Sequence, residues 1–187
     1  MNASFRNRFV ERGKTGFLLV DVQDKLFPLV ENPVEASEAM IKAIKGFKLL
    51  GLPYIVSEQY PEKLGGTIAE LKGLIDQERV FSKTFFSCLK DDKLKEALLK
   101  ESVDTWILLG IEAHVCILQT AKDLILHGKQ CVVLNDAISS RSVYDYSSAI
   151  AELRDIGARV SSVETILFEL LQNSKAPEFK SVSQLIK

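Results

Sequence analysis

The sequence predicts an α/β fold in which helices cover both faces of a parallel sheet. Short apolar runs alternate with helix-length segments along most of the chain. These runs are rich in Val, Ile and Leu with little polar alternation, as is typical of strands buried on both faces. Gly51, Gly128 and Gly157 each follow a helical pattern and precede an apolar run, where a left-handed residue commonly ends a helix. The sequence therefore predicts three layers, with the sheet between two layers of helices.

The first half of the chain supplies three strands, each followed by a helical segment. The apolar runs "GFLLVDVQ", "PYIVSEQ" and "RVFSKT" predict strands over residues 16–23, 53–59 and 79–84. Helical spacing of apolar residues predicts helices over residues 34–50, 68–71 and 91–101. The first of these helices ends at Gly51.

The second half repeats the same order. "DTWILLGI", "KQCVVLND" and "ARVSSVE" predict strands over residues 104–111, 129–136 and 158–164. A helix is expected to open directly after the fourth strand, and others over residues 144–156 and 165–171. The spacing of Phe179, Val182, Leu185 and Ile186 predicts a last amphipathic helix, packed on the domain or on a neighbouring subunit.

The 187 residues show no repeat or linker that would divide the chain. We therefore expect an N-terminal arm over residues 1–14 and a single domain over residues 15–187 that includes the amphipathic tail. The arm carries Arg6, Arg8, Arg12 and Lys14 against one acid. We interpret it as a solvated arm; the alternative is an organelle transit segment, which would place the protein in mitochondria.

Composition argues against several functional classes. The formal net charge is -1 and basic residues are scattered, which gives no footprint for nucleic acid or an anionic membrane. No apolar run approaches the roughly 20 residues that span a bilayer. Three cysteines without close spacing favour a reducing, cytoplasmic location. The two histidines belong to no metal-binding pattern, so no metal site is predicted.

Ligand sites in open parallel sheets lie beyond the carboxyl ends of the strands, where two charged residues occur. Asp21 stands where the first apolar run ends. It is either a buried general base or a strand-end residue that caps the next turn. Lys83 ends the third run among phenylalanines. It either stabilises negative charge or lays its stem along apolar surface with the amine in water.

Cys116 follows the fourth strand at the start of a helical pattern. The free amides and positive dipole at a helix N-terminus favour a thiolate, and the same amides can hold an oxyanion. The alternative is a small buried hydrophobe, an interpretation that fits Cys88 and Cys131 better. Carboxylate, lysine and thiol would all project from one edge of the sheet, and together they form the parts of an activated nucleophile.

At these residues the sequence resembles the isochorismatase-like superfamily of cysteine hydrolases. The resemblance rests on five blocks in order: "LLVDVQDKL", "VSEQYPEKLGGT", "FSKTFFSCL", "GIEAHVCILQTAKDL" and "NDAISSRS". It runs from about Thr15 to the C-terminus, and "PEFKSVSQLIK" is similar to the ending of the isochorismatase domain-containing branch.

The resemblance implies a Rossmann-like sheet with strand order 3-2-1-4-5-6 and a catalytic triad of Asp21, Lys83 and Cys116. It also implies a non-proline cis peptide between Ile111 and Glu112, with the backbone amides of Glu112 and Cys116 as the oxyanion hole. The implied reaction cleaves a small amide or related C–N bond through a thioester, without metal or other cofactor.

Departures from related subfamilies narrow the expected reaction. Nicotinamidases carry metal-binding histidines after the second strand, whereas this chain has Ser57, Glu58, Gln59 and Tyr60 there. Enzymes that hydrolyse the vinyl ether of isochorismate do not use the nucleophilic cysteine. Both reactions are therefore disfavoured here.

Other residues near these blocks are weaker candidates. Gln23, Phe27, Gln59 and Tyr60 are candidate substrate-binding residues, and ordinary loop packing is an equal alternative for each. His114 is interpreted as a packing or surface residue, because a side chain two positions from Cys116 points elsewhere. Arg141 either binds an anion near the crevice or holds a loop.

Two further roles remain open. The chain is either a hydrolase or a catalytically silent small-molecule-binding or assembly protein that retains the pocket, with the amphipathic tail at an oligomer interface. A homo-oligomer is expected in both cases. Redox sensing by Cys116 would need a resolving thiol nearby, and the sequence shows no local cysteine pair.

Overall fold

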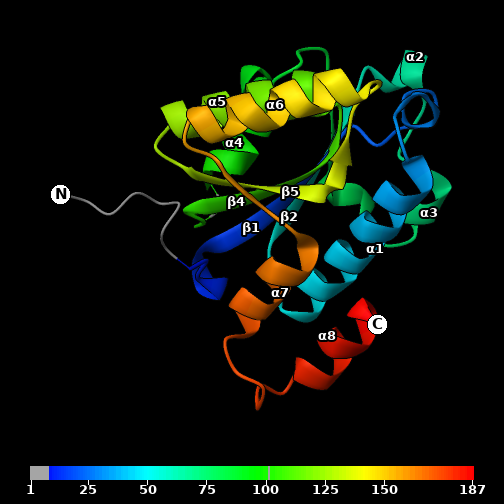
Figure 1. Cartoon of the computed structure of the whole chain (residues 1–187). Coiled ribbons are helices and arrows are strands. Elements are labelled where there is room, and N and C mark those ends of the chain that lie inside the picture. Colours follow the sequence, from blue (N-terminus) through cyan, green and yellow to red (C-terminus); the bar gives the residue numbers. More distant parts are fainter. Residues whose placement is uncertain (1–8, 101) are drawn as a thin grey trace.

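The computed structural model of the chain describes residues 9–100 and 102–187. Its sheet has six parallel strands in the order β3-β2-β1-β4-β5-β6 (Figure 1). The strands are β1 (Thr15–Val20), β2 (Tyr54–Gln59), β3 (Val80–Lys83), β4 (Thr105–Ile111), β5 (Gln130–Ser139) and β6 (Arg159–Ser161). The predicted fold class and strand order are confirmed.

Helices cover both faces of the sheet (Figure 1). One face carries α1 (Pro33–Leu49), α3 (Ala69–Lys72), α7 (Val163–Leu171) and α8 (Phe179–Ile186). The other carries α4 (Asp92–Lys100), α5 (Leu118–Leu126) and α6 (Val143–Asp155). A four-residue helix, α2 (Pro61–Leu64), lies between β2 and β3 and was not predicted, because the pattern there is too short to show helical periodicity.

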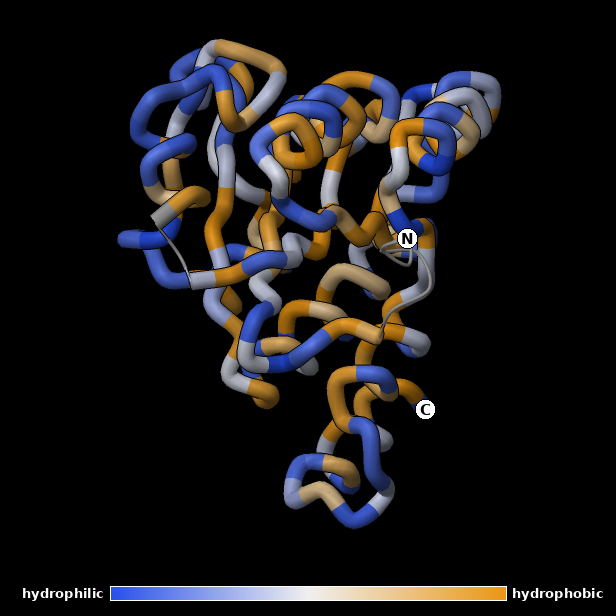
Figure 2. The backbone as a smooth tube through the Cα atoms, turned by 90° about the vertical axis from the view of Figure 1, so that its left-hand side faces the viewer, coloured by the Kyte–Doolittle hydropathy of each residue, from blue (hydrophilic) through white to orange (hydrophobic). Residues whose placement is uncertain are grey.

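The central strand shows how the sheet supplies both apolar layers. Alternate residues of β1 face opposite sides: Phe17 and Leu19 pack under α1 and α7, whereas Leu18 and Val20 pack under α4 and α5. All four are fully buried. In Figure 2, hydrophobic residues are frequent in the middle of the molecule and hydrophilic residues are frequent toward its outside. Burial of each such side chain contributes roughly 1.5–3 kcal/mol.

The expected glycine caps are present, whereas β5 differs from the prediction. Gly51, Gly128 and Gly157 have φ angles of 71°, 77° and 99°, as a left-handed helix end requires. Strand β5 continues to Ser139 because its register against β4 shifts between Leu108 and Gly110. Such an irregularity depends on pairing between strands and leaves no periodic signal in the sequence.

Residues near both ends of the chain contact the domain. Val10 is buried in the core, whereas residues 11–14 are exposed as a solvated arm would be, and Arg12 forms an ion pair with Glu178 (2.9 Å). Arg6 and Arg8, on which the transit-segment alternative depends, lie outside the described residues. Val182 of α8 is fully buried, so the amphipathic tail packs on its own chain.

No helix in the described part of the chain is both long enough and apolar enough to cross a lipid bilayer.

Gly110 lets β4 approach β1 closely beside the ends of both strands. Its φ is 121°, and a Cβ atom there would lie 2.2 Å from the carbonyl oxygen of Val20. We expect Gly110→Ala to lower the free energy of unfolding by about 2–3 kcal/mol through backbone strain and overpacking. Denaturant unfolding measures the loss, with Gly73→Ala as the control because open space surrounds Gly73. Equal stability of the two variants would contradict this account.

Candidate functional site

Asp21, Lys83 and Cys116 meet at the carboxyl edge of the sheet. Asp21 follows β1, Lys83 ends β3, and Cys116 lies in the turn after β4. The Lys83 Nζ atom lies 2.6 Å from Asp21 Oδ2 and 3.8 Å from Cys116 Sγ. The three residues are 0%, 2% and 5% exposed, respectively. The three strand ends thus form a compact site of carboxylate, ammonium and thiol, largely shielded from water.

The Asp21 carboxylate is held by two neighbours. Its Oδ1 accepts a hydrogen bond from the Ser57 hydroxyl (2.7 Å), and its Oδ2 accepts one from Lys83. The residue has a φ of 53°, and its backbone N–H donates to the carbonyl of Ser57 (3.0 Å). A carboxylate has about four lone-pair positions, so it retains acceptor capacity beside the thiol. The geometry favours the buried carboxylate over the turn cap.

Lys83 is a buried ammonium, so the alternative of an amine extending into water is wrong. Burial alone would lower the pKa of Lys83, but Asp21 and the thiols of Cys88 and Cys116 outweigh it and raise that pKa above its ordinary value. Lys83 therefore carries a positive charge at neutral pH and balances Asp21.

Cys116 lies in a π-helical turn and not, as expected, at the start of a regular α-helix. Residues Ala113–Ile117 form a π-helical turn, η6, and the regular helix α5 begins only at Leu118. Burial, followed by the charge of Asp21, raises the pKa of the Cys116 thiol, and Lys83 offsets only part of this effect. This raised pKa favours the neutral thiol in the resting protein, the opposite of the thiolate that the helix dipole was expected to favour.

This direction of the pKa shift is testable by alkylation. A raised pKa means that the thiolate of Cys116 forms only at higher pH than in the unfolded chain, where the ordinary value is about 8.5. We expect the pH midpoint of iodoacetamide modification at Cys116, followed by peptide mass spectrometry, to lie above that of the urea-unfolded protein. A midpoint below it would contradict the neutral resting thiol.

The backbone before Cys116 has the predicted cis peptide between Ile111 and Glu112. The Glu112 carboxylate forms an ion pair with the Arg141 guanidinium, with 2.5 Å between Nε and Oε1. Arg141 therefore holds the loop after β5 against the segment that leads into Cys116. His114 points to a different neighbour, because its Nδ1 lies 3.0 Å from the Ser140 hydroxyl oxygen.

The four candidate substrate-binding residues occupy different environments. Gln23 is fully buried, and its side-chain amide bonds the backbone of Gln59 and of Gly65. Phe27 is part of the apolar core, whereas Tyr60 is 44% exposed. The Gln59 side chain contacts Lys83, with 2.8 Å between Oε1 and Nζ.

Ser57 and Cys88 are neighbours of the site that the sequence analysis did not assign to it. Ser57 ends the buried part of β2 and bonds Asp21. A polar residue at the end of a neighbouring parallel strand was the available signal. Cys88 is fully buried, and its backbone N–H donates to Thr120, one helical turn beyond Cys116. Burial raises the pKa of Cys88.

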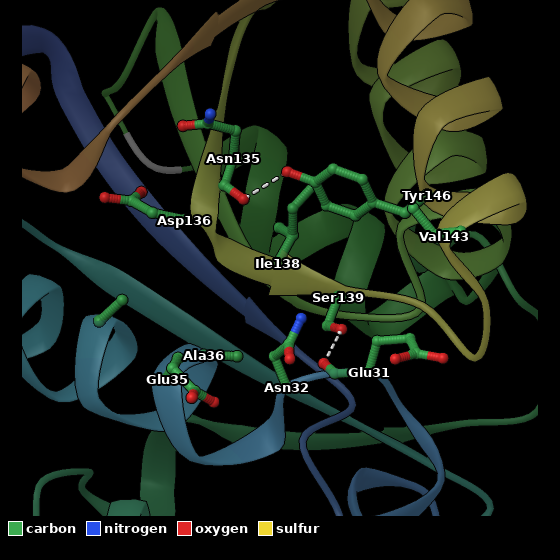
Figure 3. A pocket seen from close by; sticks show the side chains of 11 residues that line it. Glu31, Asn32, Glu35, Ala36, Asn135, Asp136, Ile138, Ser139, Val143 and Tyr146 are labelled. Carbon is green, nitrogen blue, oxygen red and sulfur yellow. Dashed lines mark hydrogen bonds between the residues drawn. The ribbon is translucent and has the colours of Figure 1, made fainter.

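A separate cavity of about 480 Å³ opens between α1 and α6, beyond β5 (Figure 3). Ser139 donates to the carbonyl oxygen of Glu31 and Tyr146 to that of Asn135 in its walls. None of the three clustered side chains lines this cavity. It is therefore distinct from the Asp–Lys–Cys site.

The fold and the clustered residues place the chain in a known class. The sequence model of the isochorismatase domain matches residues 15–165, and the chain belongs to this family. Its parallel sheet with flanking helices is the hydrolase-like fold of that family.

Named relatives agree with the family assignment. Isochorismatase domain-containing protein 1 of Danio rerio is 36% identical over 173 residues, which are 91% of this chain and 60% of that protein. The chain thus spans less than two thirds of that relative. Isochorismatase domain-containing protein 2A of Mus musculus is 36% identical over 171 residues, covering 90% of this chain and 81% of that protein.

Among solved structures, that of the MAR1 ribonuclease from Caenorhabditis elegans is similar, with a TM-score of 0.89 and 34% identity. The alignment covers 96% of this chain and 92% of that one.

Proposed function

We propose that the protein is a metal-independent cysteine hydrolase that cleaves a small amide or related C–N bond through a thioester. The observation that carries this proposal is the buried contact of Lys83 with both Asp21 and Cys116. A nucleophile needs a base within reach and a cation that stabilises its anion, and this cluster supplies all three groups.

In the proposed first half-reaction, Asp21 takes the thiol proton as Cys116 Sγ bonds to the substrate carbonyl carbon. The carbonyl π electrons move to oxygen, and the backbone amides of Glu112 and Cys116 stabilise the resulting oxyanion. Collapse of the tetrahedral intermediate breaks the C–N bond. Asp21 returns the proton to the departing amine, which leaves a thioester on Cys116.

In the second half-reaction, water attacks the thioester carbonyl and gives its proton to Asp21. The C–S bond then breaks, the acid leaves, and the proton returns to sulfur. The sum is one amide and one water converted to one acid and one amine. Lys83 stays charged throughout and stabilises each transient thiolate.

The alternative is a catalytically silent binding or assembly protein with the amphipathic tail at an oligomer interface. Val182 of that tail is buried against its own chain, whereas Leu185 and Ile186 are only partly buried. A homo-oligomer remains a prediction, which light scattering of the whole chain tests.

The name of the Caenorhabditis elegans structure describes that protein as a ribonuclease. The present chain has a formal net charge of -1 and scattered basic residues, which does not favour binding of nucleic acid. Cleavage of RNA is therefore the competing activity against which the proposal is tested.

A substrate panel tests the proposed reaction. The protein is incubated with small primary amides, with and without a carboxylate, and with short single-stranded RNA. We expect release of ammonia from at least one amide and, after an acid quench, an acyl adduct on the peptide containing Cys116. Release of ammonia without an adduct and without inhibition by alkylation of Cys116 would contradict the mechanism, and cleavage of RNA alone would replace it.

A further inference from the structure

The Lys83 ammonium has three N–H donors, and the structure gives each of them one partner. Asp21 Oδ2 lies 2.6 Å from Nζ, Gln59 Oε1 lies 2.8 Å from it, and Cys116 Sγ lies 3.8 Å from it. Two short hydrogen bonds to oxygen therefore fix the rotation of the ammonium, and the remaining donor faces the sulfur.

The Gln59 side chain is itself locked in orientation. Its Nε2 donates to the carbonyl oxygen of Thr84 (2.8 Å), so the amide oxygen must face Lys83. A reversed amide would place N–H groups against the ammonium and oxygen against the Thr84 carbonyl. Because both contacts would then repel, one orientation is strongly favoured.

The Gln59 backbone is held by a second glutamine. Gln23 Oε1 accepts from the Gln59 N–H (2.7 Å), and Gln23 Nε2 donates to the Gln59 carbonyl (3.0 Å). Gln23 is fully buried. A rigid chain of contacts therefore runs from Gln23 through Gln59 and Lys83 to Cys116, all on one edge of the sheet.

We propose that Gln59 is a positioning residue, which directs one Lys83 N–H at Cys116 Sγ so that the ammonium stabilises the thiolate as it forms. This inference rests on the proposed function and differs from the sequence-based prediction of a substrate-binding role. Without the Gln59 oxygen, the ammonium keeps its charge but is free to turn toward other acceptors. The stabilisation of the thiolate then falls although the charge near it is unchanged.

The test compares Gln59→Met with wild type, using Gln77→Met as the control because Gln77 is an exposed glutamine outside the site. The rate of iodoacetamide modification at Cys116 is measured against pH by peptide mass spectrometry, and thermal unfolding verifies the fold. We expect Gln59→Met to slow the reaction about tenfold at neutral pH and to raise its pH midpoint, as loss of one charge-assisted hydrogen bond implies. If Cys116 reacts too slowly with iodoacetamide, the ultraviolet absorbance of its thiolate is measured against pH instead. The spectrum of Cys116→Ala is subtracted so that only the thiolate of Cys116 is compared between wild type and Gln59→Met.

A double-mutant cycle separates positioning from a structural effect. The second background is Asp21→Asn with Lys83→Met, which removes the charge pair together. We expect Gln59→Met to have no further effect there, because Gln59 acts through Lys83. Equal slowing in both backgrounds, or a wild-type profile for Gln59→Met, would overturn the inference. If the Asp21→Asn, Lys83→Met variant itself modified Cys116 with the wild-type pH profile, the proposed role of the triad would be rejected instead.

Discussion

Cys116→Ala is expected to abolish amide hydrolysis and the acyl adduct while the fold persists. Loss of the nucleophile removes the only route to the proposed thioester, so turnover of a verified substrate should fall by about 10³-fold or more. The side chain is small and 5% exposed, so its truncation should cost about 1 kcal/mol of stability. Ammonia release and thermal unfolding measure the two effects.

The matched control is Cys131→Ala. Cys131 is also a buried thiol, but it lies at the amino end of β5, paired with Trp106 of β4, whereas Lys83 lies at the carboxyl end of β3. Its replacement should cost similar stability and leave turnover near the wild-type value. Full turnover by Cys116→Ala would reject covalent catalysis by this residue.

Lys83→Met is expected to destabilise the protein by about 3–5 kcal/mol. Methionine replaces the stem but leaves the Asp21 carboxylate buried without its cation, and an uncompensated buried charge is costly. The double variant Asp21→Asn with Lys83→Met removes both charges and should recover most of the loss. Urea unfolding of wild type, single variant and double variant measures this.

Comparing the unfolding free energies of wild type, the single variant and the double variant identifies the cause of the lost stability. If the single variant lost less than about 1 kcal/mol, Asp21 would be hydrated or otherwise compensated, in conflict with its complete burial. If the double variant were no more stable than the single one, the loss would arise from packing of the lysine stem and not from charge.

The strand and helix order was predictable because burial on both faces leaves a strong compositional mark. Strands β1 and β4 are mostly apolar and buried throughout, and Gly51 and Gly157 end helices where their positive φ favours a residue without a side chain. The register shift of β5 and the π-helical turn at Cys116 were not predictable. Both arise from pairing and packing between distant segments, which local periodicity does not encode.

The site was predictable in position but less so in electrostatics. Strand ends and family resemblance brought Asp21, Lys83 and Cys116 together as candidates, and the structure clusters them. Free amides and the helix dipole were expected to favour the Cys116 thiolate, whereas burial, which depends on the whole fold, raises the pKa of this thiol. Gln59 was predicted only as a substrate-binding candidate, since a glutamine at the end of a strand can contact either substrate or a neighbouring side chain.

The ion pair between Arg12 and Glu178 ties the two ends of the chain together beside Leu50, whose carbonyl also accepts from Arg12. Leu50 lies between the end of α1 and the start of β2, so this junction lies at the amino edge of the sheet, across from Cys116. Substitutions at this junction would therefore change the packing of the terminal segments at the edge of the sheet opposite the Asp–Lys–Cys site. A support attached at this junction would leave the edge of the sheet that carries Cys116 uncovered.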